Sequence, residues 1–280
     1  MQVYTTIKEL HNCIALKNTK SIGFVPTMGA LHQGHLSLIK KAQSQNDLII
    51  CSVFVNPKQF NNANDLKLYP KNISLDTSLL ESAGCDILFA PAVEEIYPNS
   101  DSHNISNVNF GNLTKVMEAK HRPGHFDGVV MVVKRLFEIV KPENAYFGEK
   151  DFQQLAIIKQ LVKKYNFNIN IISCPIIRED DGLAMSSRNV NLSQVERSNA
   201  AKISKILLEA KNTFLKEGAF ETKKWVEAQI QSIPCFKLDY FEFAKSDDLS
   251  IEVENNQTNI RAFIAVYVGK VRLIDNIKIT

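Results

Sequence analysis

Two histidines three positions apart, His32 and His35, begin an apolar-periodic run in "PTMGALHQGHLSL" (residues 26–38). On a helix, residues i and i+3 share a face, so both imidazoles would point the same way. A helix N-terminus also offers free backbone N–H groups and a partial positive charge, which favour phosphate. Imidazoles placed there could donate to phosphoryl oxygens and stabilise a leaving pyrophosphate, and Gly34 leaves room for a ligand near the backbone. The pattern alone fits a polar helix cap equally well.

Two further stretches carry groups that bind oxygen-rich ligands. In "FVNPKQF" (54–60), Gln59 can both donate and accept hydrogen bonds, although a turn at a strand end is the plainer interpretation. In "HRPGHFDGV" (121–129), Arg122 could pair bidentately with phosphate or carboxylate. The neighbouring His125 fits a helix-capping role equally well. Neither stretch is decisive alone.

The stretch "FGEKDFQQL" (147–155) is more informative. Lys150 is a point charge suited to phosphate, and Asp151 is a good cap for the helix that follows. Gln153 and Gln154 would point to different faces of that helix, so we expect at most one of them to reach a ligand.

A fifth stretch, "DGLAMSSRN" (181–189), groups Ser186, Ser187 and Arg188. Hydroxyls and a guanidinium can form a mobile phosphate clamp, and the alternative is a polar turn that joins two domains. The sequence shows no acid–base dyad, nucleophile elbow or Walker A loop. We therefore expect a site that binds and polarises phosphate without a protein nucleophile.

Alternating strand-like and helix-like segments position these residues. Continuous apolar strands separated by helices predict an α/β fold with a parallel sheet covered on both faces. The polar stretches follow predicted strands, and ligands bind at the carboxyl ends of such strands. The expected strands are 21–26, 47–55, 85–91, 144–149 and 169–177, and the expected helices are 35–44, 73–84, 126–142 and 151–166.

The remaining residues have a different pattern. An amphipathic helix over 193–218 opens with a capping box, Ser193-x-x-Glu196. After a further helix come strand-like runs at 237–244, 259–269 and 271–277. We expect a Rossmann-like domain over residues 1–176 and a smaller α+β lid domain over residues 177–280.

Bulk properties exclude several classes of protein. The chain has 280 residues and a net charge of +3 spread along its length, which favours anionic ligands weakly and gives no sign of nucleic-acid binding. It shows no signal peptide, and its longest apolar runs are too short to span a bilayer, so we expect a cytoplasmic protein without membrane contact. The five scattered cysteines lack zinc-site spacing and are expected to be reduced.

The order and spacing of "PTMGALHQGHLSL", "FVNPKQF", "RPGHFDGV", "FGEKDFQQL" and "MSSRN" closely resemble the pantothenate synthetase (pantoate–β-alanine ligase) family. The likeness is dense from about residue 20 to 190 and continues through "LDYFEFA" and "RLIDN". Two departures are Ala119, where a glycine is expected, and "YPKN" (69–72) in place of "YPR". The HxGH signature alone is shared with wider nucleotidyltransferases and class I aminoacyl-tRNA synthetases.

The resemblance implies an ATP- and pantoate-binding first domain, a lid, and a homodimer. It implies that pantoate attacks Mg²⁺-bound ATP to form pantoyl-adenylate, and that β-alanine then displaces AMP; the metal ligands stay unknown. Catalytic roles would fall to His35 as proton donor, His32 and Lys150, and pantoate would contact Gln59, Gln154 and, as a supporting residue, Arg122. Gln59 would also contact β-alanine. The residues implied to bind ATP are Met28, Gly29, Ala30, Leu31, His32, Gln33, Gly34, His35, Gly148, Glu149, Lys150, Asp151, Ile177, Met185, Ser186, Ser187 and Arg188.

Two alternatives remain at this stage. One is another HxGH enzyme that moves AMP onto a phosphorylated acceptor, which should need Arg or Lys where Gln59 and Gln154 stand. The other is a nucleotide sensor without catalysis, in which His35→Ala would spare the biological output while ATP binding survives.

Overall fold

The computed structural model describes residues 1–17, 19–98, 109–254 and 257–280. The chain divides into two compact units. The first comprises residues 1–110, 122–149 and 157–175, and the second comprises 111–121, 150–156 and 176–280. The expected boundary after residue 176 stays a prediction, and the structure adds two earlier segments to the second unit.

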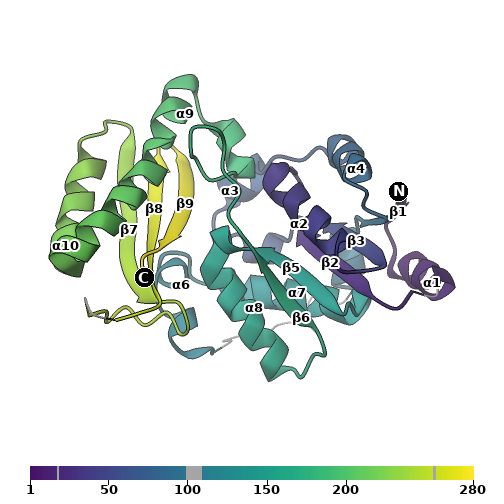
Figure 1. The fold of residues 1–280 in the computed structure, drawn as a ribbon. Helices are drawn as coiled ribbons and strands as arrows, with labels where there is room; N and C mark the ends of the chain where they lie inside the picture. Colours follow the sequence, from purple (N-terminus) through teal and green to yellow (C-terminus); the bar gives the residue numbers. More distant parts are fainter. Residues whose placement is uncertain (18, 99–108, 255–256) are drawn as a thin grey trace. The chain divides into compact units, whose positions relative to one another are not determined.

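The first unit is built on a six-stranded parallel sheet with the order β1-β4-β3-β2-β5-β6. The strands β2, β3, β5 and β6 can be followed in Figure 1. This arrangement confirms the predicted α/β class. The predicted strands and helices are all present, with ends shifted by a few residues. The strands are β1 (Gln2–Tyr4), β2 (Ile22–Thr27), β3 (Leu48–Val53), β4 (Ile87–Phe89), β5 (Asn144–Gly148) and β6 (Asn170–Cys174).

Helices pack on both faces of this sheet because its strands are apolar on both sides. On one face, Val25 and Cys51 join a buried cluster with Ile39 of α2. On the other, Phe24 meets Phe137 of α7 edge to face, with ring centroids 6.5 Å apart. The helices that belong wholly or partly to this unit are α1 (Ile7–Lys17), α2 (Gln33–Gln43), α3 (Ala63–Leu68), α4 (Ile73–Ser82), α5 (Val93–Ile96), α7 (His125–Val140) and α8 (Phe152–Lys164).

The second unit contains a three-stranded antiparallel sheet, β7 (Phe236–Lys245), β8 (Ile260–Val268) and β9 (Val271–Lys278). Its core joins apolar residues of this sheet to those of α10 (Lys202–Gln231). The short helix α6 (Glu118–His121) also belongs to this unit. The antiparallel sheet and its helices confirm the predicted α+β character.

The helix predicted over 193–218 is two helices in the structure. The first, α9 (Gln194–Ala200), opens with the predicted capping box between Ser193 and Glu196. The second, α10, runs to Gln231, but Gly218 inside it has a non-helical φ of 83°. Glycine adopts positive φ without steric cost, so the chain kinks at the predicted helix end and then continues.

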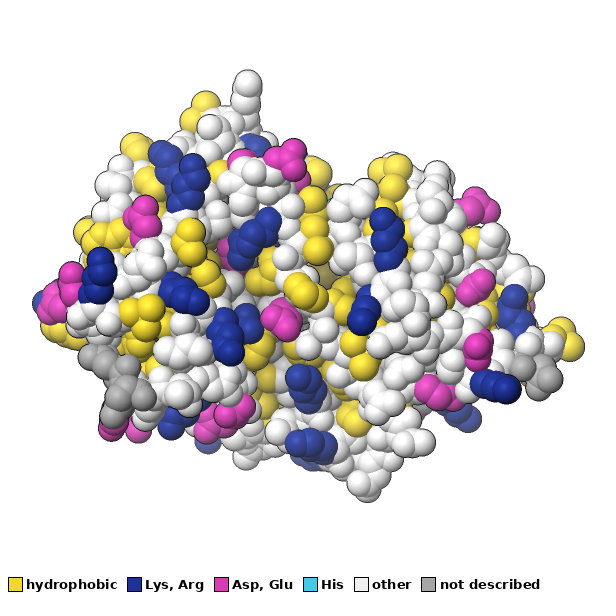
Figure 2. All heavy atoms as spheres, in the orientation of Figure 1, with side chains coloured by type: hydrophobic (Ala, Val, Ile, Leu, Met, Phe, Trp, Pro, Cys, Tyr) yellow, Lys and Arg dark blue, Asp and Glu magenta, His cyan; other side chains and the backbone are white. Residues whose placement is uncertain are grey.

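Lys, Arg, Asp and Glu side chains are scattered over the visible surface instead of forming one basic patch (Figure 2). Among the described residues, every helix is too short or too polar to cross a membrane.

Candidate active site

A buried carboxylate shapes the loop that follows β2. Asp76 of α4 is 1% exposed, and its two oxygens accept hydrogen bonds from the backbone N–H groups of Ala30 (3.0 Å) and Leu31 (2.7 Å). Gly29 and Ala30 both have positive φ, and a Cβ on Gly29 would lie 2.8 Å from an Asp76 oxygen. Asp76 therefore fixes the loop that leads into α2. No local sequence pattern indicates this role for Asp76.

His32 and His35 form the cap of α2, which confirms their predicted place at a helix start. The His32 Nδ1 accepts from Gly34 N–H at 3.1 Å, and the His35 Nδ1 accepts from His32 N–H at 3.3 Å. Their ring centroids lie 4.0 Å apart. The two histidines thus form a reciprocal capping box built from imidazoles.

The cap also determines which nitrogen of each ring carries the proton. A backbone N–H can only donate, so each Nδ1 must be an unprotonated acceptor. In the neutral rings the proton therefore lies on Nε2. Capping and phosphate binding, the two interpretations of this motif, are compatible because they use different nitrogens.

Gln59 is the buried residue of the short turn η1 (Pro57–Gln59), just after β3. Its Nε2 is 2.8 Å from the Met28 Sδ, and its Oε1 accepts from Asn56 Nδ2 at 3.2 Å. Burial raises the pKa of Tyr97, so its hydroxyl stays protonated and donates to Asn56 Oδ1 at 3.2 Å. Two predicted site residues, Met28 and Gln59, are thereby brought together.

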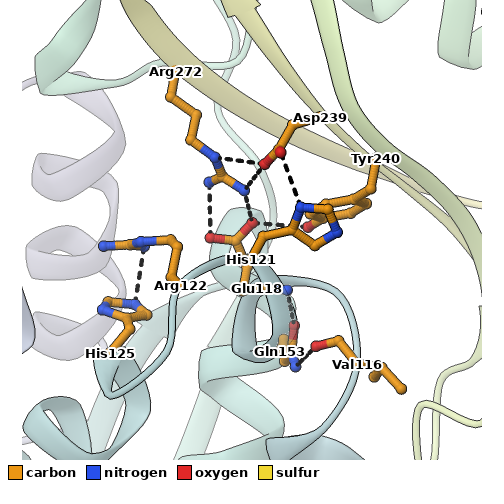
Figure 3. A network of polar contacts seen from close by, with 9 residues as sticks. All are labelled: Val116, Glu118, His121, Arg122, His125, Gln153, Asp239, Tyr240 and Arg272. Carbon is orange, nitrogen blue, oxygen red and sulfur yellow. Dashed lines mark hydrogen bonds and ion pairs between the residues drawn. The ribbon is translucent and has the colours of Figure 1, made fainter. Parts of the chain in front are cut away.

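His125 links Gln59 to Arg122. The Arg122 Nη1 donates to His125 Nε2 at 3.1 Å (Figure 3), and the His125 Nδ1 lies 2.9 Å from the Gln59 carbonyl oxygen. Arginine is always a donor, so the His125 Nε2 accepts and its Nδ1–H donates to Gln59. His125 is 7% exposed. The N-cap of α7 is Gly124, so His125 does not take the helix-capping role that the sequence also allowed. No local pattern shows its contact with residue 59.

Gly148 ends β5, the neighbour of β2 in the sheet. The parallel register of Gly23 with Asn144 places the carboxyl ends of both strands at one edge. Gly148 and Glu149 of the first unit thus follow a strand adjacent to the one that leads to His32.

The segment 150–156 of the second unit holds Gln153 and Gln154 in different surroundings. Gln153 is buried, and its amide donates to the Leu113 carbonyl oxygen at 2.8 Å. The amide also donates to the Val116 carbonyl oxygen (2.9 Å) and accepts from Glu118 N–H (3.0 Å), as Figure 3 shows. Gln154 is half-buried, and its side chain makes no hydrogen bond to the described residues. Gln153 is therefore structural, and Gln154 is the glutamine available to a ligand.

An ionic network holds Glu118 in this unit. Arg272 of β9 contacts both Glu118 oxygens (2.7 and 2.9 Å) and also Asp239 (2.8 Å), as Figure 3 shows. Asp239 lies 2.9 Å from His121 Nδ1. Burial raises the pKa of Tyr240, whose hydroxyl donates to Glu118 at 2.9 Å. The network fastens the segment 111–121, which Gln153 contacts, onto the C-terminal sheet.

The predicted phosphate clamp lies on a short hairpin and the turn after it. Met185 N–H donates to the Ile177 carbonyl at 3.0 Å, and the Ser186 hydroxyl accepts from Arg188 N–H at 3.3 Å. The structure thus brings Ile177 beside Met185. Met185, Ser186, Ser187 and Arg188 are all half-buried.

The two units each gather one set of predicted residues. The first holds the segment from Met28 to His35, with Gln59, Arg122, Gly148 and Glu149; the second holds Lys150, Asp151, Gln154, Ile177 and Met185 to Arg188. Within the described residues, no group of three or more His, Cys, Asp and Glu side chains could hold a metal ion.

Comparison with known proteins assigns the family. The family model for pantoate–β-alanine ligase matches residues 2–278. The chain belongs to the pantoate–β-alanine ligase family. It is 49% identical to the pantothenate synthetase of Bacteroides fragilis over 282 aligned residues, with 99% of each chain covered.

Solved structures of this family share the fold. A pantothenate synthetase from Thermus thermophilus superposes with a TM-score of 0.92 at 39% identity, covering 100% of this chain and 99% of that one. A pantoate–β-alanine ligase from Francisella tularensis, complexed with "Beta-gamma ATP" and β-alanine, gives a TM-score of 0.83 at 42% identity, covering 99% and 97%. The predicted family, fold class and ligase activity are confirmed.

Proposed function

We propose that the protein condenses pantoate with β-alanine at the expense of ATP, giving pantothenate, AMP and pyrophosphate. In the first half-reaction a pantoate carboxylate oxygen attacks the α-phosphorus of ATP, and pyrophosphate leaves. In the second, the β-alanine amine attacks the acyl carbon, and AMP leaves with the bridging oxygen. Membership of the ligase family and the Francisella relative complexed with "Beta-gamma ATP" and β-alanine support this reaction.

The single observation that carries the proposal is the imidazole pair at the start of α2. Each Nδ1 is engaged by the backbone, so each Nε2 carries the proton and can donate to phosphoryl oxygens. Donors fixed in place before reaction stabilise charge that develops on a leaving group. We assign proton donation to His35 and phosphate binding to His32.

The other predicted residues take supporting roles. Gln59 holds pantoate and lies close to β-alanine, Gln154 holds pantoate, and Arg122 supports their binding. Lys150 neutralises phosphate charge. The remaining residues that the sequence analysis assigned to ATP keep that role.

Mg²⁺ would enter bound to ATP. Mg²⁺ commonly keeps several waters and binds through substrate phosphates with one or two carboxylates, so the lack of a larger acidic cluster among the described residues fits this role. The half-exposed carboxylate of Asp151 is the candidate ligand. We also propose a cytoplasmic homodimer, and light scattering would test the dimer.

Oxygen labelling tests the reaction. With pantoate labelled by ¹⁸O in its carboxylate, the proposal expects AMP to form only with both acids present and to carry one ¹⁸O atom. Three results would exclude the proposal: ADP as the product, AMP without the label, or AMP released when neither pantoate nor β-alanine is present. His35→Ala serves as the inactive control.

A further inference from the structure

The strand β9 carries "RLIDN" (272–276), and the proposed function gives no role to its last two residues. Asp275 and Asn276 are 4% and 2% exposed. Consecutive side chains of a strand point to opposite faces, so the two can hold different segments. Buried polar groups are costly unless they are hydrogen-bonded, which makes their partners informative.

Asn276 binds the backbone of Lys150. Its Nδ2 donates to the Lys150 carbonyl oxygen at 2.9 Å, and its Oδ1 accepts from Arg261 Nη1 at 2.5 Å. Because arginine only donates, the amide oxygen must face Arg261 and the NH₂ must face Lys150. The Arg261 guanidinium also lies 4.2 Å from the ring centre of Phe152. The chain at Lys150 is therefore fixed to β9.

Asp275 holds the hairpin that carries the predicted phosphate clamp. Its two oxygens accept from both terminal nitrogens of Arg178, at 2.7 and 3.0 Å. Arg178 also donates to the Gly182 carbonyl at 3.0 Å and pairs with Ala184 in an isolated bridge. A bidentate pair of this kind fixes orientation as well as distance.

We propose that Asp275 and Asn276 are positioning residues for ATP, which set Lys150 and the segment 177–188 relative to each other. The inference rests on the proposed function, in which both segments bind the nucleotide. Lysine has a long, flexible side chain, so the position of its ammonium group depends on how firmly its backbone is held. Small misplacements of binding groups cost large factors in rate, and anchored supporting residues prevent them.

The first test is Asn276→Asp, which keeps the size and the acceptor for Arg261 but replaces the donor to the Lys150 carbonyl with a carboxylate oxygen. We expect the KM for ATP to rise at least tenfold and the KM for β-alanine to stay within twofold. Lys270→Ala, at an exposed position in the β8–β9 turn, is the matched control and should change neither. Asp275→Asn provides a second variant, which should also raise the KM for ATP.

A double-mutant cycle separates positioning from general stability. If Asn276 acts through Lys150, Asn276→Asp should add almost nothing to Lys150→Ala, while Asp275→Asn should add to it. An unchanged KM for ATP in both variants, or equal rises in KM for all three substrates, would overturn the inference. Affinity for β,γ-methylene-ATP, measured by calorimetry, tests it even if the wild-type protein makes no pantothenate. A failure of the wild-type protein to make pantothenate would refute the proposed function but would leave the positioning role open to this binding measurement.

Discussion

The imidazoles of His32 and His35 each use one ring nitrogen for the fold. Their Nδ1 atoms complete the cap of α2, and the protons are thereby assigned to Nε2. Stability and chemistry can then be changed separately at these two positions, because a substitution can keep the acceptor near the backbone and remove the distal donor.

His32→Asn is the sharpest such change. Asparagine is among the best N-cap residues, so its side-chain oxygen should keep the hydrogen bond from Gly34. We expect the melting temperature to be unchanged or higher, while kcat/KM falls about 10²–10³-fold, as for the loss of one preorganised donor. Pantothenate formation and thermal unfolding measure the two effects. Unchanged turnover would rule out a role for the distal nitrogen.

The two ring nitrogens of His125 can also be tested separately, because they contact two different residues that are predicted to bind substrate, Gln59 and Arg122. His125→Asn should keep the donor to the Gln59 carbonyl and lose the acceptor for Arg122, whereas the longer His125→Gln should do the reverse. We expect the asparagine variant to match Arg122→Ala in activity, and the glutamine variant to raise the KM for pantoate about tenfold, as expected for losing one hydrogen bond. Steady-state kinetics checks both, and identical behaviour of the two variants would contradict the bridging role.

At the scale of elements, the close approach of α7 to the turn η1 positions Gln59. A Cβ on Gly128 would lie 2.3 Å from the Lys58 carbonyl oxygen and 2.6 Å from the Gln59 Cα. Only glycine lets the helix and the turn come this close, and Asn56 uses the proximity to donate to the Gly128 carbonyl at 3.0 Å.

Gly128→Ala should therefore reverse the usual benefit of alanine in a helix. That benefit is roughly 0.5–1 kcal/mol, and overpacking typically costs about 1–3 kcal/mol. We expect a net loss in the free energy of unfolding, together with a higher KM for pantoate as Gln59 shifts. Urea denaturation and kinetics provide the measurements. Gly148→Ala, whose Cβ meets nothing within 4 Å, is the control for folding.

Local pattern predicted most of the helices and strands, whereas it missed residues that position the candidate site. The helix α2 was predicted because apolar spacing and a polar start are local signals, whereas the three-residue strand β1 and the helix α1 that follows it were not predicted. The roles of the predicted site residues remain proposals. Asp76 and Asn276 were missed because they act through hydrogen bonds across 45 and 126 residues of chain, which no local pattern shows.

At the scale of the whole molecule, each unit has its own hydrophobic cluster. The cluster around Ile39 lies in the first unit and the cluster around Ile264 in the second, and they share no residue. Separate cores in one chain favour unfolding in more than one step. The chain carries natural reporters for each unit.

The reactivity of two buried cysteines should report the unfolding of the first unit. Cys51 and Cys85 are buried there as free thiols, and burial raises the pKa of Cys51 well above its usual value and that of Cys85 to about 12. A raised pKa keeps a thiol protonated at neutral pH, and the thiolate is the reactive form. Both should resist iodoacetamide until this unit opens, whereas the half-buried Cys235 should react in the folded protein.

Trp225, the single tryptophan, packs against the core of the second unit and should report its unfolding by fluorescence. We expect the urea midpoint for labelling of Cys51 and Cys85, followed by mass spectrometry, to differ from the Trp225 midpoint because the cores are separate. Cys235→Ser removes the one thiol of the second unit and should leave the labelling midpoint of Cys51 and Cys85 unchanged. Coincident midpoints would instead show that the two units unfold as one cooperative structure.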